Sequence, residues 1–108
     1  MAECDLLIVG GTVIDPASGY HGRGDVAIVG DQIVAVEPDL SAWRAARRLD
    51  AIGKLVTPGL IDLHTHLGFE LHTQVVDPDE ICPQSSVTTA VDQGSVGAFT
   101  FPWYCERV

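Results

Sequence analysis

Two histidines one residue apart, His64 and His66, stand near the end of the stretch TPGLIDLHTHLG, residues 57–68. Successive side chains of a β-strand point to opposite faces, so both imidazoles and Asp62 are expected on one face of such a strand. Two imidazoles with this spacing can reach one divalent ion at about 2.0–2.1 Å. Asp62, one step deeper in the strand, is expected to orient a histidine or to fix the local hydrogen bonding.

The same pattern has a second interpretation. A His-x-His pair also arises by chance on a half-buried strand, and the spacing alone does not decide between the two. The aliphatic setting favours a bound ligand, because a polar face among apolar residues is costly to bury unless a partner satisfies it.

Both histidines must lie on a β-strand for this geometry, and the surrounding sequence predicts such a strand. Residues 55–67 are nearly continuous aliphatic sequence, typical of a strand covered on both faces as in a parallel sheet. A second such run spans residues 87–92, and Pro78 between the two is placed to start a helix. Strand, loop with helix, and strand together form a βα unit that leads into the next strand.

The first half of the chain is predicted to be a small β-sheet unit. Residues 25–29 and 32–36 are β-branched runs joined by Gly30-Asp31, and a leading glycine favours a type II′ hairpin turn. Residues 39–46 are the one plausible helix here, since they contain the good helix formers Ala, Leu and Arg. Residues 47–51 can add a strand. The fold class is therefore α/β with a β-rich N-terminal part, divided into residues 1–56 and 57–108.

Several motifs resemble those of a known family. The segment PGLIDLHTH, residues 58–66, closely resembles the PGxIDxHxH signature of the amidohydrolase superfamily of metal-dependent hydrolases. Residues 5–15 resemble that superfamily's N-terminal β-sandwich strands, residues 30–36 resemble the hairpin that follows, and residues 87–92 resemble the second barrel strand. The last segment is most similar to the amidohydrolase/deacetylase branch, near dihydroorotases, hydantoinases and D-aminoacylases.

The sequence departs from that pattern at three places. Ser86 stands where a glycine commonly precedes Val-Thr-Thr, and Gln93 stands where a small residue is usual. Residues 103–105, Trp-Tyr-Cys, replace a glycine and a basic helix.

The resemblance implies a (β/α)8 TIM-type barrel with a β-sandwich, of which this chain would hold the sandwich strands and the first barrel strands. It implies that the complete enzyme holds one or two divalent metal ions, usually zinc, and that His64 and His66 bind one of them. Asp62 would support these two ligands. The general-base aspartate is expected beyond Val108. Because such a barrel takes about 250 residues, the chain is expected to be an N-terminal portion that is inactive by itself.

The implied reaction is hydrolysis of a C–N bond, in an amide or cyclic amide, through metal-activated water. Three alternatives stay open: ester cleavage, deamination, and a non-catalytic β-rich module that associates with another subunit.

Three further polar residues are candidates for a role. Glu70 and His72 follow the first barrel strand, where substrate contacts often arise, although a solvated loop is the other interpretation. Asp92 ends the second strand, where it could face the site or cap a turn.

Composition limits the partners. The 108 residues carry a formal charge of −9 and only six Lys and Arg, which argues against nucleic acid as a partner. No stretch approaches the ~18 apolar residues of a membrane span. The acidic N-terminus does not resemble a signal peptide, and three cysteines without CxxC spacing suit free thiols in the cytoplasm. We therefore expect a cytoplasmic protein with a small-molecule substrate in the complete enzyme, and formation of a homo-oligomer stays open.

Overall fold

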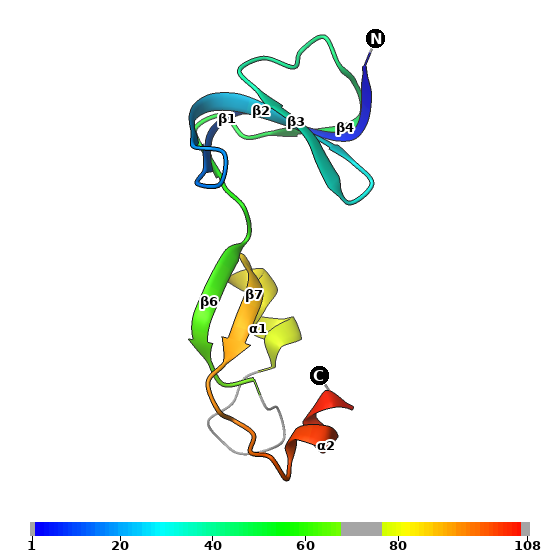
Figure 1. The fold of residues 1–108 in the computed structure, drawn as a ribbon. Coiled ribbons are helices and arrows are strands. Elements are labelled where there is room, and N and C mark those ends of the chain that lie inside the picture. Colours follow the sequence, from blue (N-terminus) through cyan, green and yellow to red (C-terminus); the bar gives the residue numbers. More distant parts are fainter. Residues whose placement is uncertain (1, 68–76, 107–108) are drawn as a thin grey trace. The chain divides into compact units, whose positions relative to one another are not determined.

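The computed structural model describes residues 2–67 and 77–106. Strands predominate in these ranges, and the helices within them are short (Figure 1). The elements are β1 (Glu3–Asp15), β2 (Tyr20–Val29), β3 (Gln32–Glu37), β4 (Arg44–Asp50), β5 (Leu55–Val56), β6 (Leu60–Thr65), α1 (Pro78–Gln84), β7 (Val87–Asp92) and α2 (Phe101–Cys105). The chain divides into two compact units, Met1–Pro58 and Gly59–Val108.

The first unit is a sheet with the strand order β3-β2-β1-β4, and β5 also pairs with β1. β1 runs antiparallel to β2 and parallel to β4 and β5. β1 continues through Gly10-Gly11 as one strand, with a shift of register between Ile8 and Gly11. The core contains Leu7 and Ala27, both 0% exposed, together with Cys4 and Leu40.

The carboxylate of Asp25 is buried in this unit and fixes two distant segments. It accepts hydrogen bonds from the backbone N–H of Gly10 at 2.8 Å and from that of Leu40 at 2.9 Å. The two bonds satisfy the buried carboxylate, as buried polar groups require. Through Asp25 they also tie the middle of β1 to the segment before β4.

The predicted hairpin is present between β2 and β3. Gly30 has a φ of 58°, whereas Asp31 has no positive φ. A positive φ at the first turn residue alone fits the type II′ turn that the glycine position predicted.

The predicted helix over residues 39–46 was wrong. Residues 41–43 form a turn, in which the N–H of Trp43 donates to the carbonyl of Leu40 at 2.9 Å. Residues 44–46 instead belong to β4, where Arg44 pairs with Glu3 and Ala45 pairs with Cys4 of β1. Eight residues are too few for a stable helix in water, so pairing with β1 overrides the local propensity.

The second unit contains two parallel strands, β6 and β7, with α1 packed against β7 (Figure 1). Pro78 begins α1 as predicted, and the side chain of Asp77 caps the helix by accepting from the N–H of Asp79 at 2.9 Å. Residues 55–67 are not one strand covered on both faces. Pro58, which has no N–H to donate, lies between β5 and β6, and the described residues leave most of β6 exposed.

Within the described ranges, no helix has both the length and the apolar composition needed to cross a bilayer.

Candidate metal site

The two histidines of the sequence motif lie together at the C-terminal end of β6. His64 is exposed and His66 is half-buried. Their ring centroids are 5.8 Å apart, with an angle of 69° between the ring planes. Rings this close lie on one side of the strand end, as the spacing predicted.

This separation is close to what a shared metal ion requires. With Zn–N distances of about 2.0–2.1 Å and tetrahedral angles, two imidazole centroids would lie about 5 Å apart. The observed separation exceeds that value by less than about 1 Å, a difference that small side-chain rotations can remove. Imidazole nitrogen is also a preferred zinc ligand, so the residue types and the ring separation are compatible with two ligands of one zinc ion.

Asp62 acts on the backbone beside the pair. Its carboxylate Oδ1 accepts a hydrogen bond from the N–H of His64 at 3.0 Å. The β6–β7 register is irregular between Asp62 and Thr65, so this amide has a local side-chain acceptor where the ladder is interrupted. Of the two roles predicted for Asp62, this bond corresponds to fixing the local hydrogen bonding.

Asp92, at the end of β7, organises the loop that faces the histidines. Its Oδ2 accepts from the N–H of Leu67 at 2.8 Å, and its Oδ1 accepts from the N–H groups of Gly94 at 2.9 Å and Ser95 at 2.7 Å. Burial by itself would raise the pKa of Asp92, but the Ser95 side chain and these three amides together lower that pKa to about 2. The carboxylate is therefore ionised at neutral pH and caps the turn.

Ser95 contacts the metal-site candidate directly, and the sequence did not single it out for that role. Its Oγ lies 3.2 Å from Nδ1 of His66. The sequence did contain a signal for this turn, the segment Asp92-Gln93-Gly94-Ser95. The side chain of an aspartate typically accepts from backbone N–H groups two or three residues later and so forms an Asx turn. Only the pairing of β6 with β7 brings this turn to the histidines.

Gln93 has a structural role that explains part of its departure from the family pattern. Its side-chain Nε2 donates to the carbonyl of Leu63 at 2.9 Å, and its N–H donates to the carbonyl of Thr65 at 2.9 Å. The Thr65 hydroxyl in turn donates to the carbonyl of Val91 at 2.9 Å. These bonds hold the ends of β6 and β7 together where their regular ladder is broken.

Two ligands are fewer than a catalytic zinc site needs, since such sites use three protein ligands and a water. In the part of the chain that the structure describes, no group of three or more His, Cys, Asp or Glu side chains could hold a metal ion. Glu70 and His72, predicted as candidate substrate contacts, lie outside the described residues.

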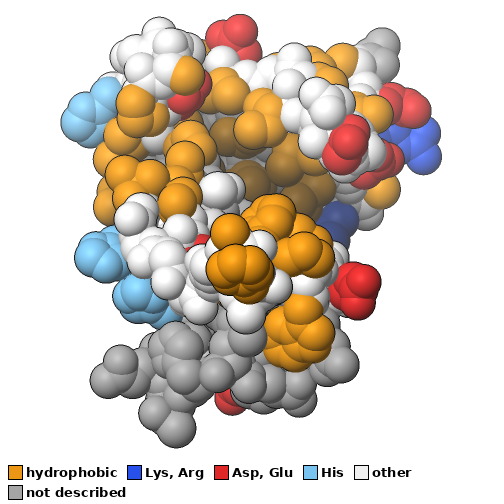
Figure 2. All heavy atoms as spheres, turned by 60° about the horizontal axis from the view of Figure 1, so that its bottom comes forward, with side chains coloured by type: hydrophobic (Ala, Val, Ile, Leu, Met, Phe, Trp, Pro, Cys, Tyr) orange, Lys and Arg blue, Asp and Glu red, His pale blue; other side chains and the backbone are white. Residues whose placement is uncertain are grey.

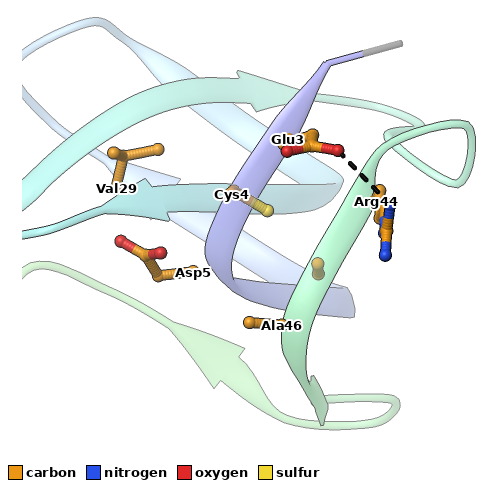
Figure 3. A pocket seen from close by; sticks show the side chains of 7 residues that line it. Glu3, Cys4, Asp5, Val29, Arg44 and Ala46 are labelled. Carbon is orange, nitrogen blue, oxygen red and sulfur yellow. Dashed lines mark ion pairs between the residues drawn. The ribbon is translucent and has the colours of Figure 1, made fainter.

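A separate cavity of about 630 Å³ lies in the first unit (Figure 3). Figure 3 shows Glu3 and Arg44 pointing toward one another at its edge, where they form an exposed ion pair of 3.7 Å. Such pairs contribute about 0–1 kcal/mol to stability. The other lining residues are Cys4, Asp5, Val29 and two alanines of β4.

Comparison with known proteins places the chain in a family. No family model matches the sequence. An N-acyl-D-glutamate deacylase of Alcaligenes xylosoxydans xylosoxydans is 55% identical over 64 residues, which cover 59% of this chain and 13% of the relative. Adenine deaminase 2 of Rhizobium meliloti (strain 1021) is 35% identical over 96 residues, covering 89% of this chain and 16% of the relative. The chain thus spans less than a fifth of the length of both relatives.

Solved structures agree with this assignment. A dihydroorotase structure matches 97% of this chain and 27% of its own, with a TM-score of 0.78 and 30% identity. The N-acyl-D-glutamate deacylase of Bordetella bronchiseptica, solved with zinc and a phosphonate inhibitor, matches 82% of this chain and 18% of its own, with a TM-score of 0.66 and 32% identity. Deacylases, deaminases and dihydroorotases are hydrolases that act on C–N bonds. The chain belongs to the amidohydrolase superfamily.

Proposed function

We propose that this chain is the N-terminal portion of a metal-dependent amidohydrolase that hydrolyses C–N bonds of amides or cyclic amides. In this proposal residues 1–56 are strands of its β-sandwich, and residues 57–108 contain the first two strands of its barrel. The observation that carries the proposal is the placement of two imidazoles 5.8 Å apart at the C-terminal end of β6, because barrel active sites lie at the C-terminal ends of the strands.

His64 and His66 would hold the metal through their ring nitrogens. Zinc is the favoured ion, because imidazole suits it and the deacylase of Bordetella bronchiseptica was solved with zinc. When bound, such an ion lowers the pKa of its water toward about 7 and so supplies a hydroxide nucleophile at neutral pH. The other ligands and the general-base aspartate are expected beyond Val108, so the 108-residue chain should not turn over a substrate.

The surface of β6 supports the barrel assignment. Leu60, Ile61 and Leu63 are 51%, 61% and 67% exposed, and Figure 2 shows hydrophobic side chains at the surface of the molecule. In a closed barrel, strands are covered by side chains of the lumen on one face and by helices on the other. These residues are therefore suited to burial under further barrel elements.

Zinc titration of the 108-residue chain tests the site. We expect weak uptake of one Zn²⁺ per chain by isothermal titration calorimetry, because two protein ligands are present instead of three. The His64→Ala/His66→Ala double variant should lose this uptake. Because His21 is exposed on β2 in the first unit, His21→Ala is the matched control and should bind zinc as the unchanged chain does. Equal uptake by the double variant and the unchanged chain would refute the site.

Deamination of a heterocycle is the second candidate reaction. The match to adenine deaminase 2 favours deamination, because it covers 89% of this chain. The match to the deacylase has the higher identity but covers 59%. Both reactions hydrolyse a C–N bond, so the same pair of metal ligands serves either. Assays of the full-length protein with N-acyl-D-amino acids and with adenine would separate them, by release of a carboxylic acid or of ammonia.

A further inference from the structure

His66 lies one residue beyond the end of β6, where the regular pairing of the strands has stopped. The last pair of the β6–β7 ladder joins Thr65 to Asp92. Both peptide groups that flank His66 are nevertheless hydrogen-bonded to the end of β7. The carbonyl of Thr65 accepts from the N–H of Gln93 at 2.9 Å, and the N–H of Leu67 donates to Oδ2 of Asp92 at 2.8 Å.

These two bonds restrict the direction in which the imidazole of His66 leaves the backbone. Because a peptide group is planar, only φ and ψ of His66 can turn one flanking peptide group relative to the other. When both groups are held, φ and ψ are held as well, and the backbone angles in turn limit the side-chain rotamers. In the resulting arrangement the ring centroid of His66 lies 5.8 Å from that of His64.

The carboxylate of Asp92 also holds the turn beside this ring. Its Oδ1 accepts from the N–H of Gly94 at 2.9 Å and from that of Ser95 at 2.7 Å. The donors to Asp92, these two and Leu67, are backbone N–H groups, which can only donate, so the direction of each bond is certain. Oγ of Ser95 lies 3.2 Å from Nδ1 of His66. One carboxylate thus fixes the peptide group after His66 and the turn that contacts the ring.

We propose that Asp92 is a positioning residue that fixes the backbone and the neighbouring turn of His66 and so directs its imidazole toward the metal ion that His64 also binds. The statement about the orientation of His66 stands on the hydrogen bonds, whereas the statement about the metal rests on the proposed function. Asp62 holds the other histidine in a similar way, since its Oδ1 accepts from the N–H of His64 at 3.0 Å.

The isosteric variant Asp92→Asn removes part of this support. An asparagine side chain has one acceptor oxygen, and its NH₂ group can only donate. It must therefore lose either the bond to Leu67 or the two bonds to Gly94 and Ser95. In the 108-residue chain without metal, we expect the backbone amides on the side that is lost to exchange with deuterium at least about 10-fold faster.

The rotamer of His66 is the measurement that separates positioning from a merely structural role. Three-bond NMR couplings of the Cβ substituents report χ1. We expect the couplings of His66 to indicate one rotamer in the unchanged chain and an average of several in Asp92→Asn. The couplings of His64 should not change, because Asp62 holds its backbone. A general loosening of the end of β6 would instead change both histidines.

Asp77→Asn is the matched control. It removes the same charge from the same unit, but it keeps the single acceptor oxygen that the N–H of Asp79 needs at the start of α1. Asparagine is also as good an N-cap as aspartate. This variant should leave the couplings of His66 and the exchange of the Leu67 amide as they are in the unchanged chain.

Two results would overturn the inference: couplings of His66 in Asp92→Asn equal to those in the unchanged chain, or an equal change in the couplings of His64 and His66. Should Asp92→Asn not fold, the unchanged chain decides. Averaged couplings for His66 there, or exchange of the Leu67 amide as fast as in an unfolded chain, would overturn it.

Zinc affinity separates this inference from the proposed function. We expect Asp92→Asn to bind Zn²⁺ about 10-fold more weakly than the unchanged chain, as loss of a supporting residue typically does, with Asp77→Asn close to the unchanged chain. If the unchanged chain took up no zinc but the rotamer of His66 depended on Asp92, the metal site would fail and the positioning role would stand. If zinc uptake required His64 and His66 but neither rotamer nor affinity depended on Asp92, the positioning role would fail alone.

Discussion

Gly59, the glycine of the Pro-Gly motif, lies so close to β7 that a side chain at this position should separate β6 from β7. A Cβ atom built on Gly59 would overlap Oγ1 and Cγ2 of Thr88 and would lie 2.6 Å from the Cβ of Thr88. Rotation about χ1 can move Oγ1 and Cγ2 away, but it cannot move Cβ, which is bonded to the backbone. The variant Gly59→Ala therefore requires the two strands to move apart.

The size of the effect follows from this distance. Non-bonded carbon atoms normally approach to about 3.5–4.0 Å, so the backbones must shift by roughly 1 Å. Such a shift strains the bond from the N–H of Leu60 to the carbonyl of Ser86, now 3.1 Å long. Overpacking typically costs about 1–3 kcal/mol, and the lower chain entropy of alanine in the unfolded state offsets about 0.4–1 kcal/mol. We expect a net loss of about 1 kcal/mol.

Urea unfolding followed by tryptophan fluorescence measures the stability lost by the second structural unit, which contains Gly59. Trp103 belongs to the second unit and Trp43 to the first, so a Trp43→Phe background isolates the signal of the second unit. With a slope of about 1–2 kcal/mol per molar urea, Gly59→Ala should lower the unfolding midpoint by about 0.5–1 M.

Two comparisons test the cause. A Cβ atom added to Gly97 would meet no heavy atom within 4 Å, and Gly97 has no positive φ, so Gly97→Ala should not lower the midpoint. Removing the opposing side chain with Thr88→Gly should make the added Gly59→Ala change nearly neutral, as a double-mutant cycle would show. A midpoint for Gly59→Ala equal to that of the unchanged chain, or an undiminished loss in the Thr88→Gly background, would refute the reasoning.

Three other changes have defined outcomes. Ser86 has a φ of 60°, where an L side chain costs about 1–2 kcal/mol, so Ser86→Gly should stabilise the second unit by about 0.5–1 kcal/mol in urea unfolding. Leu7 is fully buried in the first unit, so Leu7→Ala should cost that unit about 2–5 kcal/mol by Trp43 fluorescence. The pKa of Asp92 is about 2 in the folded chain against about 3.9 unfolded, so its stabilisation is present above about pH 4 and is lost as the pH falls toward 2. After allowance for solvent screening this amounts to about 1 kcal/mol, and acid titrations of Asp92→Asn and the unchanged chain should differ in that window.

The sequence by itself determined the features that depend on neighbouring residues. The spacing of His64 and His66 placed both rings on one side of a strand, because side chains alternate along any extended backbone. Gly30 specified the hairpin turn through its positive φ, and Pro78 specified the start of α1 because its fixed φ suits the first turn of a helix.

The tertiary structure decided what depends on residues far apart in the chain. Residues 44–46 became part of a strand because β1 supplied the pairing partner, which no local pattern reveals. Ser95 reaches His66 only because β6 and β7 lie side by side. Gly59 has no special φ, and only the approach of Thr88 makes it sterically necessary. Hydrogen bonds and close contacts of this kind depend on distances in space, which sequence separation does not set.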